Sequence, residues 1–190
     1  MIKNYKQLNI TDFRKKALDI VNAGLKELDI EKIMNERINL KKDLLSIKPE
    51  SGKILKYDLN KFSDIFVVAI GKGSSGAAEQ LEKILGSKIT KGIAIDIEKK
   101  PLKFIKSFKG THPLPSIKNI KATQKIINML KKAKSNDLVI FLIFGGGSAL
   151  LCSPAKVSLD SLKKYTHQLI NSGKDIHQIN TIRKHLSLVK

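Results

Sequence analysis

Two glycine-rich turns carry the residues whose types and spacing could do chemistry. The first has Gly71, Gly73 and Gly76 in G-x-G-x-x-G spacing, with Lys72 inside the turn. Glycines let a backbone approach an anion, and the N-terminus of the helix expected next offers N–H groups. Asp96 comes 20 residues after Gly76, where an acidic residue could bind a ribose hydroxyl of a dinucleotide. The pattern permits a nicotinamide cofactor, a smaller anion held by Lys72, or merely tight packing of a helix on a strand.

The second turn reads FGGGSALL and follows a long apolar run. Gly145, Gly146 and Gly147 precede Ser148, which stands at the start of a short helical pattern. A tight turn that needs a positive φ would account for one of these glycines but poorly for all three. Because Ser148 is not in a G-x-S-x-G context, a hydrolase nucleophile is not expected. The residues 145–148 therefore predict a second anion cradle.

Two further segments contribute polar candidates. His112 lies in GTHPLP, where prolines fix an extended loop, and it could bind an anion, transfer a proton or be structural. Near the end of the chain, polar residues recur at i, i+3, i+7 and i+10, along one face of an expected helix. A guanidinium on such a face suits a carboxylate or phosphate, although an ordinary solvated face has the same pattern. These residues are Asn180, Arg183 (or Lys184), Ser187 and Lys190.

No metal cage built from the protein's own side chains is expected. His167, His177, Cys152 and the acidic residues form no cluster with ligand spacing. A single cysteine also excludes an internal disulfide and fits a reducing compartment. The start of the sequence has no apolar leader segment, and no apolar run reaches the roughly 18 residues of a membrane span. We therefore expect a cytoplasmic protein without a membrane partner.

The elements that must position these residues alternate between strands and helices. Residues 64–70 and 137–144 are continuous apolar runs, typical of parallel strands buried on both faces. Further strands are expected at 91–97 and 102–108, and helices at 11–30, 29–40, 74–85, 115–133, 158–173 and 175–189. In the helix at 115–133 the inward residues are expected to be Ile117, Ile120, Ile126, Ile127 and Leu130. This order predicts an α/β fold, a mostly parallel sheet with helices on both faces.

The composition describes a basic chain of 190 residues with a formal net charge of +19. Only three of its 36 basic residues are arginines, and the lysines are spread along the chain without an aromatic platform. Arginine binds phosphates and bases better than lysine does, because its guanidinium forms two parallel hydrogen bonds. The scarcity of arginine therefore disfavours nucleic-acid binding. The charge fits a solvated surface and would also attract an anionic small molecule.

Four segments in this order resemble the glycerate 2-kinase family in its amino-terminal part: VVAIGKGS, THPLPS, DLVIFLIFGGGSALLCSP and GKDIHQINTIRKHLSLVK. The resemblance covers most of the chain from about Asp58 onward. It implies a Rossmann-like domain over residues 58–190, preceded by a helical arm at 1–57 that packs on it. It also implies ATP-dependent phosphorylation of D-glycerate to 2-phosphoglycerate, with Mg²⁺.

The resemblance also implies roles for residues. Lys72 and Arg183 would be catalytic and hold the glycerate carboxylate and the transferring phosphoryl group. Substrate or phosphate would be bound by Gly71, Gly73, His112, Gly145, Gly146, Gly147, Ser148, Asn180, Ser187 and Lys190. Phe144 stands where the family usually has serine, and Gly73 where it usually has alanine. The glycine at this position creates the dinucleotide-like G-x-G-x-x-G spacing.

The chains of that family are much longer, so this sequence looks truncated. The missing part is expected to supply nucleotide-binding and metal-binding groups, from a complementing C-terminal chain or a downstream segment. A homodimer is the other partner expected. Two other functions stay open. One is an NAD(P)-dependent hydroxypyruvate reductase that uses Gly71, Gly73, Gly76 and Asp96, and the other is a non-catalytic remnant that binds anions.

Overall fold

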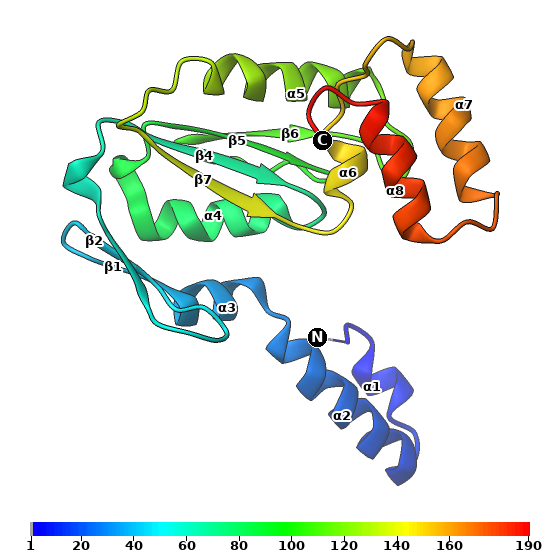
Figure 1. The fold of residues 1–190 in the computed structure, drawn as a ribbon. Coiled ribbons are helices and arrows are strands. Elements are labelled where there is room, and N and C mark those ends of the chain that lie inside the picture. Colours follow the sequence, from blue (N-terminus) through cyan, green and yellow to red (C-terminus); the bar gives the residue numbers. More distant parts are fainter. Residues whose placement is uncertain (1) are drawn as a thin grey trace. The chain divides into compact units, whose positions relative to one another are not determined.

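The structure is a computed structural model that describes residues 2–190. Its internal contacts divide the chain into two compact units, a first unit that ends at Tyr57 and a second unit, Asp58–Lys190. Figure 1 shows the elements of each unit along the chain. The candidate site residues all lie in the second unit.

The first unit combines helices with a small antiparallel sheet. Thr11 begins the long helix as predicted, because its hydroxyl accepts a hydrogen bond from the Arg14 N–H at 3.3 Å. The helix predicted over 29–40 ends at Arg37, and the next residues instead form a hairpin whose alternating side chains suit a strand. The elements are α1 (Tyr5–Leu8), α2 (Asp12–Glu27), α3 (Ile30–Arg37), β1 (Ile38–Lys41), β2 (Leu44–Ile47) and β3 (Leu55–Asp58).

The second unit is built on a parallel sheet of four strands. They are β4 (Ile65–Ile70), β5 (Lys91–Asp96), β6 (Ile105–Lys109) and β7 (Leu138–Ile143), in the order β6-β5-β4-β7. Each neighbouring pair runs parallel. This confirms the predicted α/β class with a parallel sheet.

Helices cover both faces of this sheet, α4 on one and α5 on the other (Figure 1). The predicted start and end of α4 at Ser74 and Leu85 are confirmed. Further helices follow the last strand or join the strands. The helical elements of this unit are η1 (Leu59–Lys61), α4 (Ser74–Leu85), η2 (Gly86–Lys88), α5 (Ile117–Leu130), α6 (Gly147–Leu150), α7 (Leu159–Ile170) and α8 (Ile176–His185).

The core on the α5 face is aliphatic. Val68, Ile70 and Ile95 pack against Ala122 and Ile126 of α5. The inward face predicted for α5 was partly wrong, since Ile117 is 52% exposed and the buried set includes two polar residues. Periodicity alone places isoleucines inside, whereas hydrogen bonds allow polar side chains to be buried instead. The buried residues of α5 are Asn119, Ala122, Thr123, Ile126 and Met129.

Two further predictions are corrected by the structure. The strand β7 was expected to be buried on both faces, but it stands at the edge of the sheet, with Phe141 50% and Ile143 74% exposed. The last helix was expected to run almost to the end of the chain, but α8 stops at His185. Beyond the helix, Leu188 N–H donates to Ser153 O at 2.9 Å, so the chain is extended there and pairs with the segment around Ser153.

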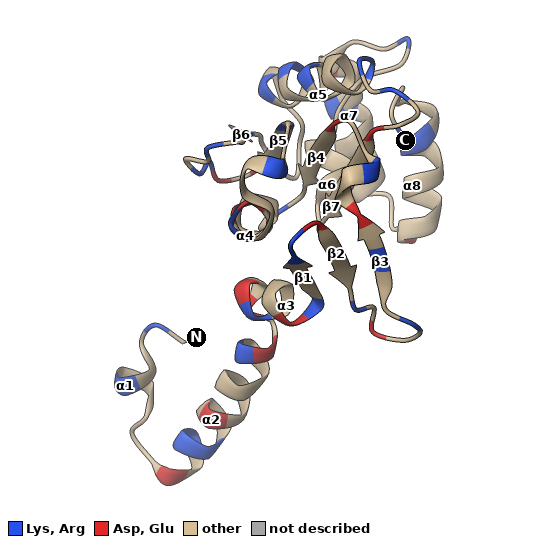
Figure 2. Cartoon of the chain, turned by 90° about the vertical axis from the view of Figure 1, so that its left-hand side faces the viewer, with Lys and Arg blue, Asp and Glu red and all other residues tan. Residues whose placement is uncertain are grey.

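Lysines and arginines are distributed over many elements of the chain, as Figure 2 shows. No helix among the described residues is long and apolar enough to cross a bilayer.

Candidate functional site

The two glycine turns lie side by side at the carboxyl edge of the sheet. They follow β4 and β7, which are paired so that Ile70 lies opposite Ile143. Backbone hydrogen bonds continue this pairing, from Phe144 N–H to Ile70 O at 2.8 Å and from Lys72 N–H to Gly145 O at 2.9 Å. Ligands of open parallel sheets bind beyond this edge.

The first turn is closed by Asp96. This carboxylate is only 2% exposed and accepts hydrogen bonds from Gly73 N–H at 3.1 Å and from Ser75 N–H at 2.9 Å. It also accepts from the Ile97 N–H at 2.6 Å. The amides that would hold a pyrophosphate at the start of α4 are therefore occupied, and the acid that would bind a ribose is enclosed.

The second turn leaves its amides open. Among the described residues, the N–H groups of Gly145, Gly146 and Ser148 donate to no acceptor in the protein. Gly147 N–H donates back to Phe144 O at 3.2 Å, which fixes the shape of the turn. Three free amides at the start of a helical turn can donate to one anion.

Lys72 and His112 both reach over Gly146. A β-carbon on Gly146 would lie 3.0 Å from His112 Nε2 and 3.3 Å from Lys72 Cε, and the φ of this residue is +80°. Only glycine fits there without strain or displacement of these two side chains. Burial and the positive charges of Lys72 and Arg183 lower the pKa of His112. The imidazole is therefore neutral at neutral pH.

A buried asparagine holds the His112 loop against the second turn. Asn119 is fully buried; its Oδ1 accepts from the Thr111 N–H at 3.0 Å and the Ser116 hydroxyl at 2.9 Å. Its Nδ2 donates to Thr111 O at 3.0 Å and to Ala149 O at 3.1 Å. The residue thus ties the loop, the start of α5 and α6 together.

Two more cations approach from the end of the chain. Arg183 of α8 is half-buried, and burial lowers the pKa of its guanidinium. Lys190 Nζ donates to Ser148 O, and burial together with the Arg183 charge lowers the pKa of Lys190 to about 8. None of the ion pairs within residues 2–190 involves Lys72, Arg183 or Lys190. A half-buried guanidinium without a counter-ion, with the exposed Lys72 and Lys190 nearby, suits an anionic ligand.

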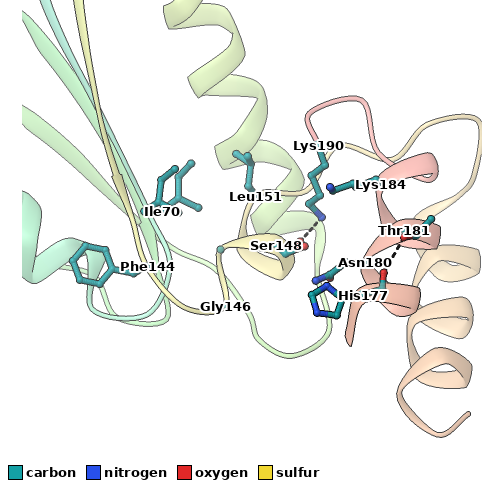
Figure 3. Close-up of a pocket in the computed structure, with 12 residues that line it drawn as sticks. Ile70, Phe144, Gly146, Ser148, Leu151, His177, Asn180, Thr181, Lys184 and Lys190 are labelled. Atoms are coloured by element: carbon teal, nitrogen blue, oxygen red, sulfur yellow. Dashed lines mark hydrogen bonds between the residues drawn. The ribbon is translucent and has the colours of Figure 1, made fainter. Parts of the chain in front are cut away.

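The polar side chains of α8 divide between two hollows. A cavity of about 560 Å³ lies between β7 and α8. Its sheet side is apolar, with Ile70 and Ile143, and its far side carries His177, Asn180, Thr181, Lys184 and Lys190 (Figure 3). Arg183 and Ser187 instead line a hollow of about 20 Å³ beside the buried Cys152. Gly146, Gly147 and Ser148 lie at the cavity, and Ser148 and Lys190 border both hollows.

The structure thus brings most of the predicted residues together. Lys72, His112 and the residues 145–148 meet around one turn. The charge of Arg183 lowers the pKa of His112, and Lys190 Nζ donates to Ser148 O. The predicted single helical face was wrong, because Ser187 and Lys190 lie beyond the end of α8. Gly71 and Gly73 shape the first turn, where a β-carbon on Gly71 would collide with Phe144 O.

Sequence reasoning missed several residues. His177 and Thr181 of the cavity carried no signal beyond their position on the helix that holds Asn180. Asn119 did carry one, since Ser116 and Asn119 form a reciprocal cap, three residues apart, at the start of α5.

The residues present do not form a magnesium site. Mg²⁺ prefers carboxylate oxygens and water. Within the part of the chain that the structure describes, no group of three or more His, Cys, Asp or Glu could hold a metal ion. Asp96, beside the first turn, is already used by backbone amides.

Comparison with known proteins assigns the chain to a family. Residues 16–190 match the family described as "Domain of unknown function (DUF4147)". The chain is 34% identical over 182 residues to the glycerate 2-kinase of Pyrococcus horikoshii, covering 94% of this chain and 39% of that protein. It is 34% identical over 173 residues to the D-glycerate 2-kinase of Thermotoga maritima, covering 88% of this chain and 39% of that protein.

The fold agrees with these relatives. The crystal structure of a glycerate kinase from Thermotoga maritima matches with a TM-score of 0.71 and 30% identity, covering 92% of this chain and 38% of that one. A relative from Agrobacterium vitis, 35% identical over 65% of this chain and 29% of its own, carries the name "putative hydroxypyruvate reductase". The chain spans 39% of the length of the two glycerate 2-kinases above. On the family match, which extends over residues 16–190, the chain belongs to the DUF4147 family.

Proposed function

We propose that this chain is the glycerate-binding part of a glycerate 2-kinase, which transfers the γ-phosphoryl group of ATP to the 2-hydroxyl of D-glycerate. One observation carries the proposal: Lys72, Arg183 and Lys190 gather at the second glycine turn without a carboxylate partner. The names of the relatives support the same activity.

The proposed roles follow from charge and position. Phosphoryl transfer is catalysed mainly by positioning and by neutralising the charge on the transferring group. Lys72 and Arg183 hold the carboxylate of glycerate and the oxygens of the transferring phosphoryl group. The open amides of Gly145, Gly146 and Ser148 donate to the same oxygens.

His112 has a separate role in this proposal. Its lowered pKa leaves the imidazole neutral and able to accept a proton at neutral pH. As the 2-hydroxyl oxygen bonds to phosphorus, the bond from phosphorus to the ADP oxygen breaks, and the hydroxyl proton passes to His112. In this proposal the groups for the adenosine and for Mg²⁺ lie in the part of the glycerate 2-kinase relatives outside the match.

A hydroxypyruvate reductase is the second candidate, favoured by the name of one relative. Its cofactor would need the start of α4, where the amides of Gly73 and Ser75 already donate to Asp96. That closure counts against a dinucleotide in the first turn.

The test is ³¹P NMR of the protein with MgATP and D-glycerate, run with the chain alone and with the remainder of the Pyrococcus horikoshii relative added as a second polypeptide. We expect a 2-phosphoglycerate signal in the second mixture. Lys72→Ala should lower its rate by about 100-fold or more, the scale of losing a group that neutralises transition-state charge. Lys118→Ala, which removes an exposed lysine of α5, should leave the rate unchanged.

Near-normal turnover by Lys72→Ala would sink the assignment of that lysine. Reduction of hydroxypyruvate with consumption of NADH would favour the reductase. A folded protein that forms neither product and binds glycerate would be the anion-binding remnant.

A further inference from the structure

The strand β7 has an unprotected edge. It is the last strand of the sheet, and its sequence LVIFLI has no charged residue and no proline. Exposed edge strands in natural proteins are normally blocked by such residues or by bulges, because an open edge recruits other strands. The composition of β7 is that of an interior strand.

The uncovered side of β7 can be assigned to one face of the sheet. Phe141 pairs with Val68, and Ile143 pairs with Ile70, and both partners belong to the core packed on α5. Since laterally paired residues point to the same face, Phe141 and Ile143 lie on the α5 face. The helix α5 packs on β5 and β6, and Phe141 and Ile143 stay 50% and 74% exposed on this face.

The backbone groups at the free edge can be assigned as well. Leu138 N–H donates to Asp64 O at 2.9 Å, and Phe144 N–H donates to Ile70 O at 2.8 Å. Because alternate residues of a strand turn their N–H and C=O groups to opposite sides, the groups of Val139, Phe141 and Ile143 point away from β4. No strand among residues 2–190 pairs with them.

The topology shows what is expected at this edge. The order β6-β5-β4-β7, with all strands parallel, is the 3-2-1-4 part of the doubly wound order 3-2-1-4-5-6. The next strand of that order lies beside β7. In this chain the connection that leaves β7 begins with α6, α7 and α8, which leave Phe141 and Ile143 exposed.

We propose that β7 is the docking site for a strand–helix unit of another polypeptide segment. Its strand pairs in parallel with Val139, Phe141 and Ile143, and its amphipathic helix covers Phe141 and Ile143. The segment corresponds to the part of the glycerate 2-kinase relatives outside the match, which is more than half of their length. Ile143 also lines the cavity beside α8, so docking completes a wall of the candidate site. The proposal rests on the fold and not on the proposed activity.

The experiment uses the unmatched remainder of the Pyrococcus horikoshii relative as the probe. Isothermal titration measures its dissociation constant for the wild-type chain, Ile143→Glu and the control Ile170→Glu. The control makes the same exchange at an isoleucine of α7 that is 53% exposed. Because Ile143→Glu puts a charge where an isoleucine side chain would be buried, it should weaken binding at least tenfold, and the control should not.

Amide hydrogen exchange locates the binding surface independently of any activity measurement. Binding should protect the amides of Val139, Phe141 and Ile143 and leave those of Leu138 and Phe144, already bonded to β4, unchanged. Absence of a complex, or equal dissociation constants for wild type and Ile143→Glu, would overturn the proposal. So would protection of these three amides in the chain alone, since a second copy or the first unit would then cover the edge.

Discussion

Replacing Asn119 by alanine tests whether one buried side chain organises the candidate site. The change removes an acceptor for the amides of Thr111 and Ser116 and a donor to Thr111 O and Ala149 O. Each unsatisfied buried group costs about 1–3 kcal/mol, but Thr111 and Ser116 are partly open to water and recover part of that. We expect the free energy of unfolding to fall by about 2–4 kcal/mol.

Thermal unfolding followed by circular dichroism measures this effect. For a chain of this length the loss corresponds to roughly 5–15 °C in Tm. The control is Asn128→Ala on the same helix, an exposed asparagine whose Oδ1 accepts one hydrogen bond, from Gln124 Nε2 at 2.9 Å. A Tm for Asn119→Ala within about 2 °C of that control would refute the network, because a surface exchange rarely changes stability by more than 0.5 kcal/mol.

Three further predictions concern the two turns and Lys190. Gly146→Ala should abolish glycerate binding in a calorimetric titration, because its β-carbon would lie 2.9 Å from the His112 ring at a φ of +80°; unchanged affinity would contradict this. Since the pKa of Lys190 is lowered to about 8, its charge is present below that pH and lost above it. Phosphate affinity should therefore fall severalfold from pH 7 to 9.5, and a Lys190→Gln variant that keeps the same fall would show that another group titrates. Asp96→Ala should lower the free energy of unfolding by about 2–4 kcal/mol in urea denaturation, because amides at the start of α4 lose a charged acceptor; a loss confined to NADH affinity would support the reductase instead.

Local features of both units were predictable from sequence. The limits of α4 follow from the glycine turn before it and Gly86 after it, and the caps Thr11 and Ser158 follow from their side chains. The pairing of two glycine turns at one edge follows from the parallel order of the strands.

Features set by distant contacts were not predictable. The run of apolar residues in β7 indicates burial on both faces, but periodicity does not state which strand lies at the edge of a sheet. The helical spacing of Arg183 and Lys190 continues past His185, whereas hydrogen bonds to residues 153–155 end the helix there. The role of Asp96 also depends on a fold contact, since its carboxylate caps the turn that it would otherwise serve as a cofactor ligand.

Amide NMR titrations with D-glycerate and, in parallel, with NADH test directly which turn binds a ligand. We expect glycerate to shift the amide signals of Gly145, Gly146 and Ser148, and those of Gly73 and Ser75 to stay in place because Asp96 already holds them. Shifts at Gly73 and Ser75 with NADH, and none at the second turn with glycerate, would contradict this expectation.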